Sequence, residues 1–179
     1  MQKTSYCRPK PRGASDNEIA EFAGKMRLGL GLKTPVNLDR AVALLGGETT
    51  RSPKTPVKPP FSYIRVEKGG GFQIGLSPSL LGGLLYRLEV AQCLGHYFLH
   101  SDAGKMSITT NYRAPYGSEK QRVIDWEAHL FACEFMMPSR ILRRCEKRFR
   151  GSTVWLAGHF QMPEPIVRLA LERMQNKAL

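Results

Sequence analysis

Three side chains of metal-binding type lie close together in one apolar segment of the chain. Cys93 precedes His96 by three residues, and His100 follows His96 by four. On a helix these spacings place side chains on neighbouring parts of one face, where they would offer sulfur and nitrogen donors to an ion such as zinc. The alternative is that Cys93 is a small core residue, His100 ends the helix and no metal binds, because free cysteines are commonly buried.

A second chemical feature is the basic stretch of residues 140–150. It holds six basic residues and one acid in eleven positions, while its apolar residues keep to one face, so an amphipathic basic helix is predicted. The basic residues are Arg140, Arg143, Arg144, Lys147, Arg148 and Arg150. This face either contacts the phosphates of a nucleic acid or an acidic protein, or is simply solvated.

The composition narrows the class of protein. A net charge of +12 predicts attraction to an anionic partner, with nucleic acid the commonest candidate and an acidic protein the next. The four cysteines form no C-x-x-C pair, which argues against a disulfide framework. The N-terminus lacks the apolar core of a secretory signal, and no stretch is long and apolar enough to span a membrane. We therefore expect a cytoplasmic protein that does not enter the membrane.

Hydrophobic periodicity predicts a mostly helical single domain over residues 17–179, preceded by a flexible basic segment over residues 1–16. The expected helices run from Asp16 or Asn17 to about Gly29, over 38–45, from Leu80 to about His100, from a Ser118 cap to Pro138, and onward to the C-terminus. These elements would carry the cysteine and both histidines on one helix.

The remaining segments complete the predicted organisation. Two short runs, 62–66 and 72–76, are joined by three consecutive glycines and predict a β-hairpin. Four prolines between residues 49 and 60 favour an extended, solvated loop. Residues 150–179 have the pattern of a helix-turn-helix, whose second helix would read a DNA groove; the alternative is that this helix pair only packs against the core.

Two segments together resemble the ImmA/IrrE family of zinc metallopeptidases. Residues 91–100 (AQCLGHYFLH) resemble the family's zinc-binding helix, usually His-Glu-Leu-Gly-His, an aromatic residue and Leu-Leu-His. Residues 125–138 resemble its Glu-x-x-Ala-Asn…Phe-Ala…Leu-Met-Pro helix. The resemblance covers nearly everything after about residue 30. It implies a zincin-like α+β fold, mostly helical, with a small antiparallel sheet or hairpin and a C-terminal helix-turn-helix-like pair.

Carried over residue by residue, the resemblance implies a damaged zinc site. Gln92 stands at the first histidine, Cys93 at the glutamate that takes a proton from the metal-bound water, and His96 at the second histidine. Glu127 is carried over as the third ligand, and His129 stands where the family usually has Asn. Gln92 offers only a neutral amide oxygen, and Cys93 a thiol in place of the base. His96 and Glu127 are thus the remaining metal ligands, with Cys93 and His100 as further donors.

These observations predict a noncatalytic ImmA/IrrE-like pseudopeptidase with no resident cofactor, or with residual zinc at most. The family's active members are associated with cleaving helix-turn-helix repressors in phages, conjugative elements and stress responses. The expected partner is therefore a repressor or another regulatory protein that is bound without being cut. Two alternatives stay open. One is an active zinc-dependent metallo-endopeptidase with a non-standard ligand set, and the other is a nucleic-acid-binding regulator built on the peptidase scaffold.

Overall fold

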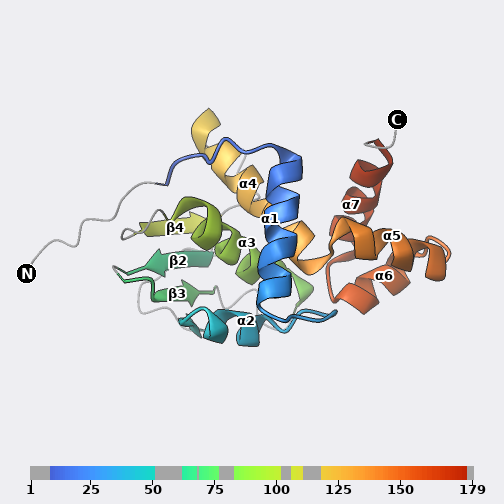
Figure 1. The fold of residues 1–179 in the computed structure, drawn as a ribbon, viewed down its shortest axis with the longest axis horizontal. Coiled ribbons are helices and arrows are strands. Elements are labelled where there is room, and N and C mark those ends of the chain that lie inside the picture. The colour runs from blue at the N-terminus through green and yellow to red at the C-terminus, as the bar shows by residue number, and fades with distance from the viewer. Residues whose placement is uncertain are drawn as a thin grey trace, which may run out of the picture.

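A computed structural model describes residues 9–50, 62–67, 69–76, 83–101, 106–110 and 118–176 (Figure 1). Its elements are α1 (Asp16–Gly29), α2 (Leu38–Leu44), β1 (Gly47–Thr50), β2 (Ser62–Val66), β3 (Phe72–Gly75), α3 (Leu84–His100), β4 (Met106–Thr110), α4 (Glu119–Met136), α5 (Ser139–Arg148), α6 (Thr153–Phe160) and α7 (Glu164–Asn176). The mostly helical α+β class predicted from the sequence is confirmed. Most of the proline-rich stretch expected to form a loop lies outside the described residues.

The sheet is larger than the predicted hairpin and is mixed rather than antiparallel. Its strand order is β1-β3-β2-β4. β2 and β3 form the expected antiparallel hairpin, with Ile64 opposite Ile74, and β4 adds an antiparallel edge beside β2. β1 lies parallel to β3 at the other edge. The expected hairpin is therefore present, within a sheet that also contains one parallel pair, β1 with β3.

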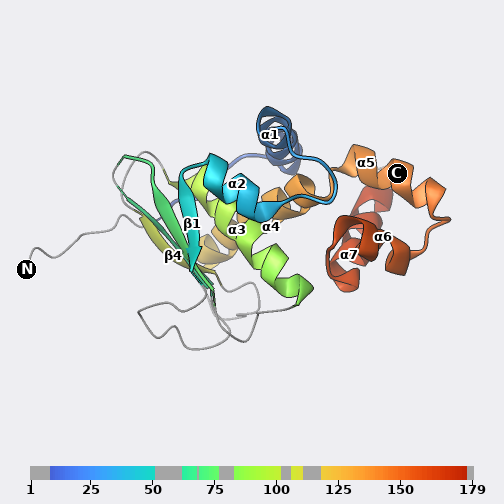
Figure 2. The same cartoon turned by 90° about the horizontal axis from the view of Figure 1, so that it is seen from below.

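The centre of the molecule is the packed pair α3 and α4. α3 contacts β2 and β4 of the sheet, α4 packs along α3, and α1 covers α4 on the side away from the sheet (Figures 1 and 2). The helices approach closely at Gly95, where an added Cβ would lie 2.7 Å from the carbonyl oxygen of Ala128. This close contact brings the cysteine and both histidines of α3 against the polar residues of α4.

α1 begins at Asp16, and its N-cap is the residue before that position rather than Asp16 or Asn17, the caps that the sequence favoured. Ser15 is the N-cap, because its side chain accepts from the backbone of Glu18 while the Glu18 carboxylate accepts from the backbone of Ser15. This reciprocal pair is a capping box, which satisfies two backbone donors that a helix start leaves open. It fixes the direction in which residues 9–14 leave α1, toward α4.

Helices α5, α6 and α7 gather at one end of the molecule (Figure 2). α6 and α7 are joined by a turn at Gln161, which has a φ of +52°. Apolar side chains of α6 and α7 belong to the shared core, and polar contacts of Arg87 and of Glu134 also join this C-terminal unit to the rest. Arg87 of α3 donates to the carbonyl oxygens of Gln161 and Val36. The Glu134 carboxylate of α4 accepts from Ser139 and from Arg173.

Within the residues that the structure describes, no helix combines the length and apolar character needed to cross a membrane.

Candidate functional site

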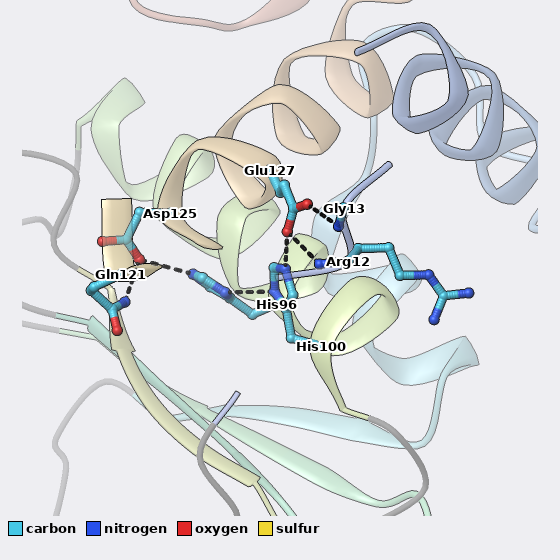
Figure 3. Close-up of polar contacts among 7 residues, drawn as sticks. All are labelled: Arg12, Gly13, His96, His100, Gln121, Asp125 and Glu127. Atoms are coloured by element: carbon cyan, nitrogen blue, oxygen red, sulfur yellow. Dashed lines mark hydrogen bonds and ion pairs between the residues drawn. The ribbon is translucent and has the colours of Figure 1, made fainter. Parts of the chain in front are cut away.

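A hydrogen-bonded chain runs from His96 through His100 to Glu127 (Figure 3). The two histidines lie one turn apart on α3, with their Nδ1 atoms 3.1 Å apart. Nε2 of His100 lies 2.9 Å from Oε2 of Glu127 on α4. Because the carboxylate accepts, the proton of His100 is assigned to Nε2, and its Nδ1 then accepts a hydrogen bond from Nδ1 of His96. This assignment leaves Nε2 of His96 with a lone pair and no proton.

The lone pair of His96 faces a second carboxylate, that of Asp125. Oδ1 of Asp125 lies 3.9 Å from Nε2 of His96, too far for a hydrogen bond, and accepts instead from Gln121 at 2.8 Å. Burial, and then the neighbouring His100, lower the pKa of His96 to about 3, so its ring is neutral at pH 7. Burial raises the pKa of Asp125. A bare imidazole nitrogen and a carboxylate oxygen thus point toward the same small space.

Glu127 is held by the N-terminal segment as well as by His100. The backbone N–H of Arg12 donates to Oε2 at 2.9 Å, and that of Gly13 donates to Oε1 at 2.8 Å (Figure 3). Gly13 has a φ of +69°, which a glycine adopts without strain, and consecutive N–H groups near such a residue form a cradle for an anion. The Glu127 carboxylate therefore has three donors. Arg12 and Gly13 lie in the stretch that the sequence predicts to be flexible, yet here they form part of the site.

Gln92, one turn before His96 on α3, belongs to a different network. Its Nε2 lies 2.9 Å from Nδ1 of His129, so Nδ1 accepts and Nε2 of His129 carries the proton toward Sγ of Cys133 at 3.6 Å. Burial, and then the charge of Arg173, lower the pKa of His129. Oε1 of Gln92 is buried without a hydrogen-bond partner among the described residues. Gln92 and Glu127 thus do not meet in one cluster.

Cys93 belongs to the hydrophobic core and not to either network. Its side chain is fully buried. Burial, and then the charge of Glu89, raise the pKa of the thiol well above its ordinary value. A thiol held neutral in this way cannot accept a proton from water, so Cys93 does not replace the glutamate as a general base.

The side chains present do not match a zinc site. Such sites use three or four His, Cys, Asp or Glu ligands, and no group of three of these is arranged to hold a metal ion in the part of the chain that the structure describes. His96 and Asp125 supply two donors facing one point. Glu127 is already bound by the backbone of residues 12 and 13 and by His100, and Cys93 is fully buried in the core.

A cavity of about 370 Å³ opens between α4 and α7, beside the Gln92 network. His129 and Cys133 line it at its polar end, with Arg173 close by. Its other walls are mostly apolar, and Trp126 and Leu169 on them are 48% and 57% exposed. Large exposed apolar side chains around a hollow are typical of a surface that another molecule covers.

The six predicted basic residues lie on α5 and just beyond it. Four of them, with Ser139, line a shallow hollow on the surface of α5: Arg140, Arg143, Arg144 and Lys147. Within the described residues none of the six forms an ion pair, whereas Arg168 and Arg173 of α7 are paired with Glu164 and Glu134. The positive charge of α5 is therefore uncompensated.

α3 carries the motif positions Gln92, Cys93 and His96 and packs on a small mixed sheet within a mostly helical α+β fold. The model of peptidase family M78, described as the IrrE N-terminal-like domain, matches residues 84–172, about half of the chain. The chain belongs to the ImmA/IrrE family. No curated protein matches it.

Family membership gives the two networks a common explanation. The family motif has a histidine where this chain has Gln92, and an asparagine where it has His129. The imidazole and the amide have therefore changed places between α3 and α4. In the motif the glutamate stands four residues before the asparagine, and counting back from His129 gives Asp125 rather than Glu127. The geometry also favours Asp125 for that position, because it faces His96. Glu127 was predicted as the third ligand from its residue type. The spacing of the motif favours Asp125 for the same position.

Proposed function

We propose that this protein is a noncatalytic member of the ImmA/IrrE family that binds a regulatory protein without cleaving it. The observation that carries the proposal is the pairing of Gln92 with His129 at 2.9 Å. Gln92 stands where a zinc ligand belongs in the family, and its amide is engaged by an imidazole that replaces the family's asparagine. The glutamine at position 92 therefore has a hydrogen-bond partner of its own, His129, in place of a metal ion.

The chemistry of the other positions supports the same conclusion. Hydrolysis by this family's route needs a base beside a metal-bound water. Cys93, at the base position, is a buried neutral thiol. Glu127 already accepts three hydrogen bonds from protein groups. A site whose polar groups satisfy one another is suited to a structural or binding role.

The cavity between α4 and α7 is the surface we assign to the partner. A regulatory protein would insert an apolar side chain between Trp126 and Leu169, with a polar group reaching His129 or Arg173. Since the active members of the family act on helix-turn-helix repressors in phages, mobile elements and stress responses, a repressor in the cytoplasm is the partner that the proposal names.

The test is a binding and cleavage experiment with a purified partner. Crosslinking and mass spectrometry identify a candidate, and calorimetry then measures its affinity for the wild type, for Leu169→Glu and for the control Leu44→Glu. Leu44 is 53% exposed on α2, away from the cavity. We expect binding to be lost only in Leu169→Glu, with the partner intact. Cleavage of the partner that a chelator stops would overturn the proposal.

One observation favours the rival hypothesis of a zinc peptidase with a non-standard ligand set. Nε2 of His96 and Oδ1 of Asp125 point at each other from 3.9 Å without a hydrogen bond, as two ligands of an ion would. Elemental analysis of protein purified without chelator separates the two hypotheses. About one zinc per chain, lost in His96→Gln, would establish the rival.

A further inference from the structure

The unpaired charge of α5 lies in a continuous stripe. Arg140, Arg143, Arg144, Lys147 and Arg148 stand at helix positions i, i+3, i+4, i+7 and i+8, so they occupy one face of the helix. All five are exposed. At 1.5 Å per residue the stripe is about 12 Å long, enough to contact several phosphates of one strand.

Aromatic side chains lie at the C-terminal end of this stripe. The guanidinium of Arg148 lies 5.6 Å from the centre of the Phe149 ring, and Phe149 in turn contacts His159 of α6 at 5.4 Å between ring centres. Trp155 stands one turn before His159 on the same face of α6, and it is 69% exposed. Trp155 therefore presents a large exposed ring one turn from the histidine that contacts Phe149, the residue that ends the helix carrying the cations.

We propose that the α5 stripe and Trp155 form a binding site for single-stranded nucleic acid, with the cations on successive phosphates and a base stacked on the indole. This combination of a positive track and an exposed aromatic ring is how proteins hold single strands without reading their sequence. The site is separate from the cavity between α4 and α7, and it does not depend on the proposed function.

The helix-turn-helix-like pair does not offer an equivalent site for duplex DNA. α7 would be the helix in the groove, yet its exposed face includes Glu172, and both of its arginines are engaged in ion pairs. A helix that enters the major groove needs side chains free to reach bases and phosphates. The uncompensated charge belongs to α5, and the exposed ring beside it suits unpaired bases, which a duplex hides.

Fluorescence anisotropy with labelled oligothymidine of about twenty nucleotides tests the proposal, with a hairpin duplex of equal charge as the comparison. The α5 variant is Arg143→Gln, Arg144→Gln and Lys147→Gln together. Its control removes the same charge from three exposed residues elsewhere: Lys25→Gln, Lys33→Gln and Arg40→Gln. Trp155→Ala probes stacking, and polyglutamate tests an acidic polypeptide as ligand. All the substituted side chains are exposed, so folding is checked simply by circular dichroism.

We expect the α5 variant to weaken binding of the single strand at least tenfold at 0.1 M salt. The slope of log affinity against log salt should fall by about two, at roughly 0.7 for each phosphate of a single strand that the variant no longer neutralises. Trp155→Ala should weaken single-strand binding about fivefold or more and leave duplex binding unchanged. Equal effects of the two charge variants, indifference to Trp155→Ala, tighter binding of the duplex, or equal binding of polyglutamate would each overturn the proposal.

Discussion

The polar residues around His96 are joined by hydrogen bonds among protein groups. Glu127 accepts from two backbone N–H groups and from His100, and Gln92 is engaged by His129. Each of these contacts offsets the cost of burying a polar group, which reaches several kcal/mol when no partner is present. The exception is Oε1 of Gln92, buried without a partner in the described part of the chain.

Restoring the family motif should restore metal binding, and the geometry specifies which carboxylate takes part. Gln92→His with Cys93→Glu supplies a second imidazole and the base, while His96 already presents a bare Nε2 toward Asp125. We expect calorimetry to show zinc affinity increased at least a hundredfold over the wild type, because three ligands then replace two.

The same double variant can show whether Asp125 or Glu127 is the carboxylate that binds zinc. Adding Asp125→Asn should abolish most of the gain in zinc affinity, whereas adding Glu127→Gln should leave most of it, because Glu127 faces the backbone cradle and His100. If zinc binding instead depends on Glu127, the assignment of Asp125 is wrong. If the double variant folds and binds zinc no better than the wild type, the site is not a decayed zinc site at all.

Buried thiols should make the protein sensitive to alkali. Burial, opposed by Arg173 and aided by Glu134, raises the pKa of Cys133 to about 12. Above pH 9 the unfolded chain releases this proton while the folded protein keeps it, so stability falls as the pH rises from about 9 toward 12. By pH 10 the loss from this thiol is about 1.4 kcal/mol, taking an ordinary pKa of 9.0 for the unfolded chain.

Urea unfolding at pH 8 and pH 10 measures this effect as a difference between two proteins. Tyrosines and lysines also titrate in this range, but they contribute equally to the wild type and to Cys133→Ala. The fall in unfolding free energy between the two pH values should therefore be smaller in Cys133→Ala. An identical fall in both proteins would show that Cys133 ionises normally in the folded state.

At the scale of elements, the contact of α3 with α4 depends on Gly95. A Cβ there would lie 2.7 Å from the carbonyl oxygen of Ala128, which is backbone and cannot move aside cheaply. Gly95→Ala should therefore lower the unfolding free energy by about 1–3 kcal/mol, as overpacking does. Gly24→Ala is the control, because nothing lies within 4 Å of its added Cβ, and it should stabilise α1 by about 0.5–1 kcal/mol. Equal effects in chemical denaturation would contradict the close packing.

The helices and strands that were predicted from the sequence are those that depend on neighbouring residues, such as apolar spacing and helix caps. Apolar spacing predicted α2, Ser118 and Pro138 bounded α4, and two β-branched and aromatic runs predicted the β2–β3 hairpin. β1 and β4 were missed. Residues 47–50 read GETT, without alternating apolar positions, and this strand forms only because β3 lies parallel beside it.

The site was predictable only as far as the motif reached. The motif identified Gln92, Cys93 and His96 by spacing along one helix. No pattern along the sequence connects Gly13 with Glu127, 114 positions away, or makes His129 the partner of Gln92. Contacts of this kind depend on how α1, α3 and α4 pack, which local periodicity does not specify.

At the scale of the whole molecule, α5, α6 and α7 form a unit that relies on few connections to the rest. Arg87→Met keeps the apolar stem of the side chain and removes its hydrogen bonds to Gln161 and Val36. Hydrogen exchange should show amide protection lowered in α6 and α7 by about 1–2 kcal/mol, while α3 and α4 change little. Arg122→Met, an exposed change on α4, is the control. Uniform loss of protection across all helices would show that the unit opens only with the whole domain.

The arrangement of these connections also sets how the protein carries mechanical load. A pull between α1 and the end of α7 is carried by the core packing of α6 and α7 and by three further links: the Arg87 hydrogen bond to Gln161, the chain between α4 and α5, and the ion pair of Glu134 with Arg173. Each of these polar links is a single contact, whereas the strands of the sheet share an applied force across several parallel hydrogen bonds. Under tension the C-terminal helices would detach first and leave the sheet and the α3–α4 pair intact, so the molecule has a built-in weak joint.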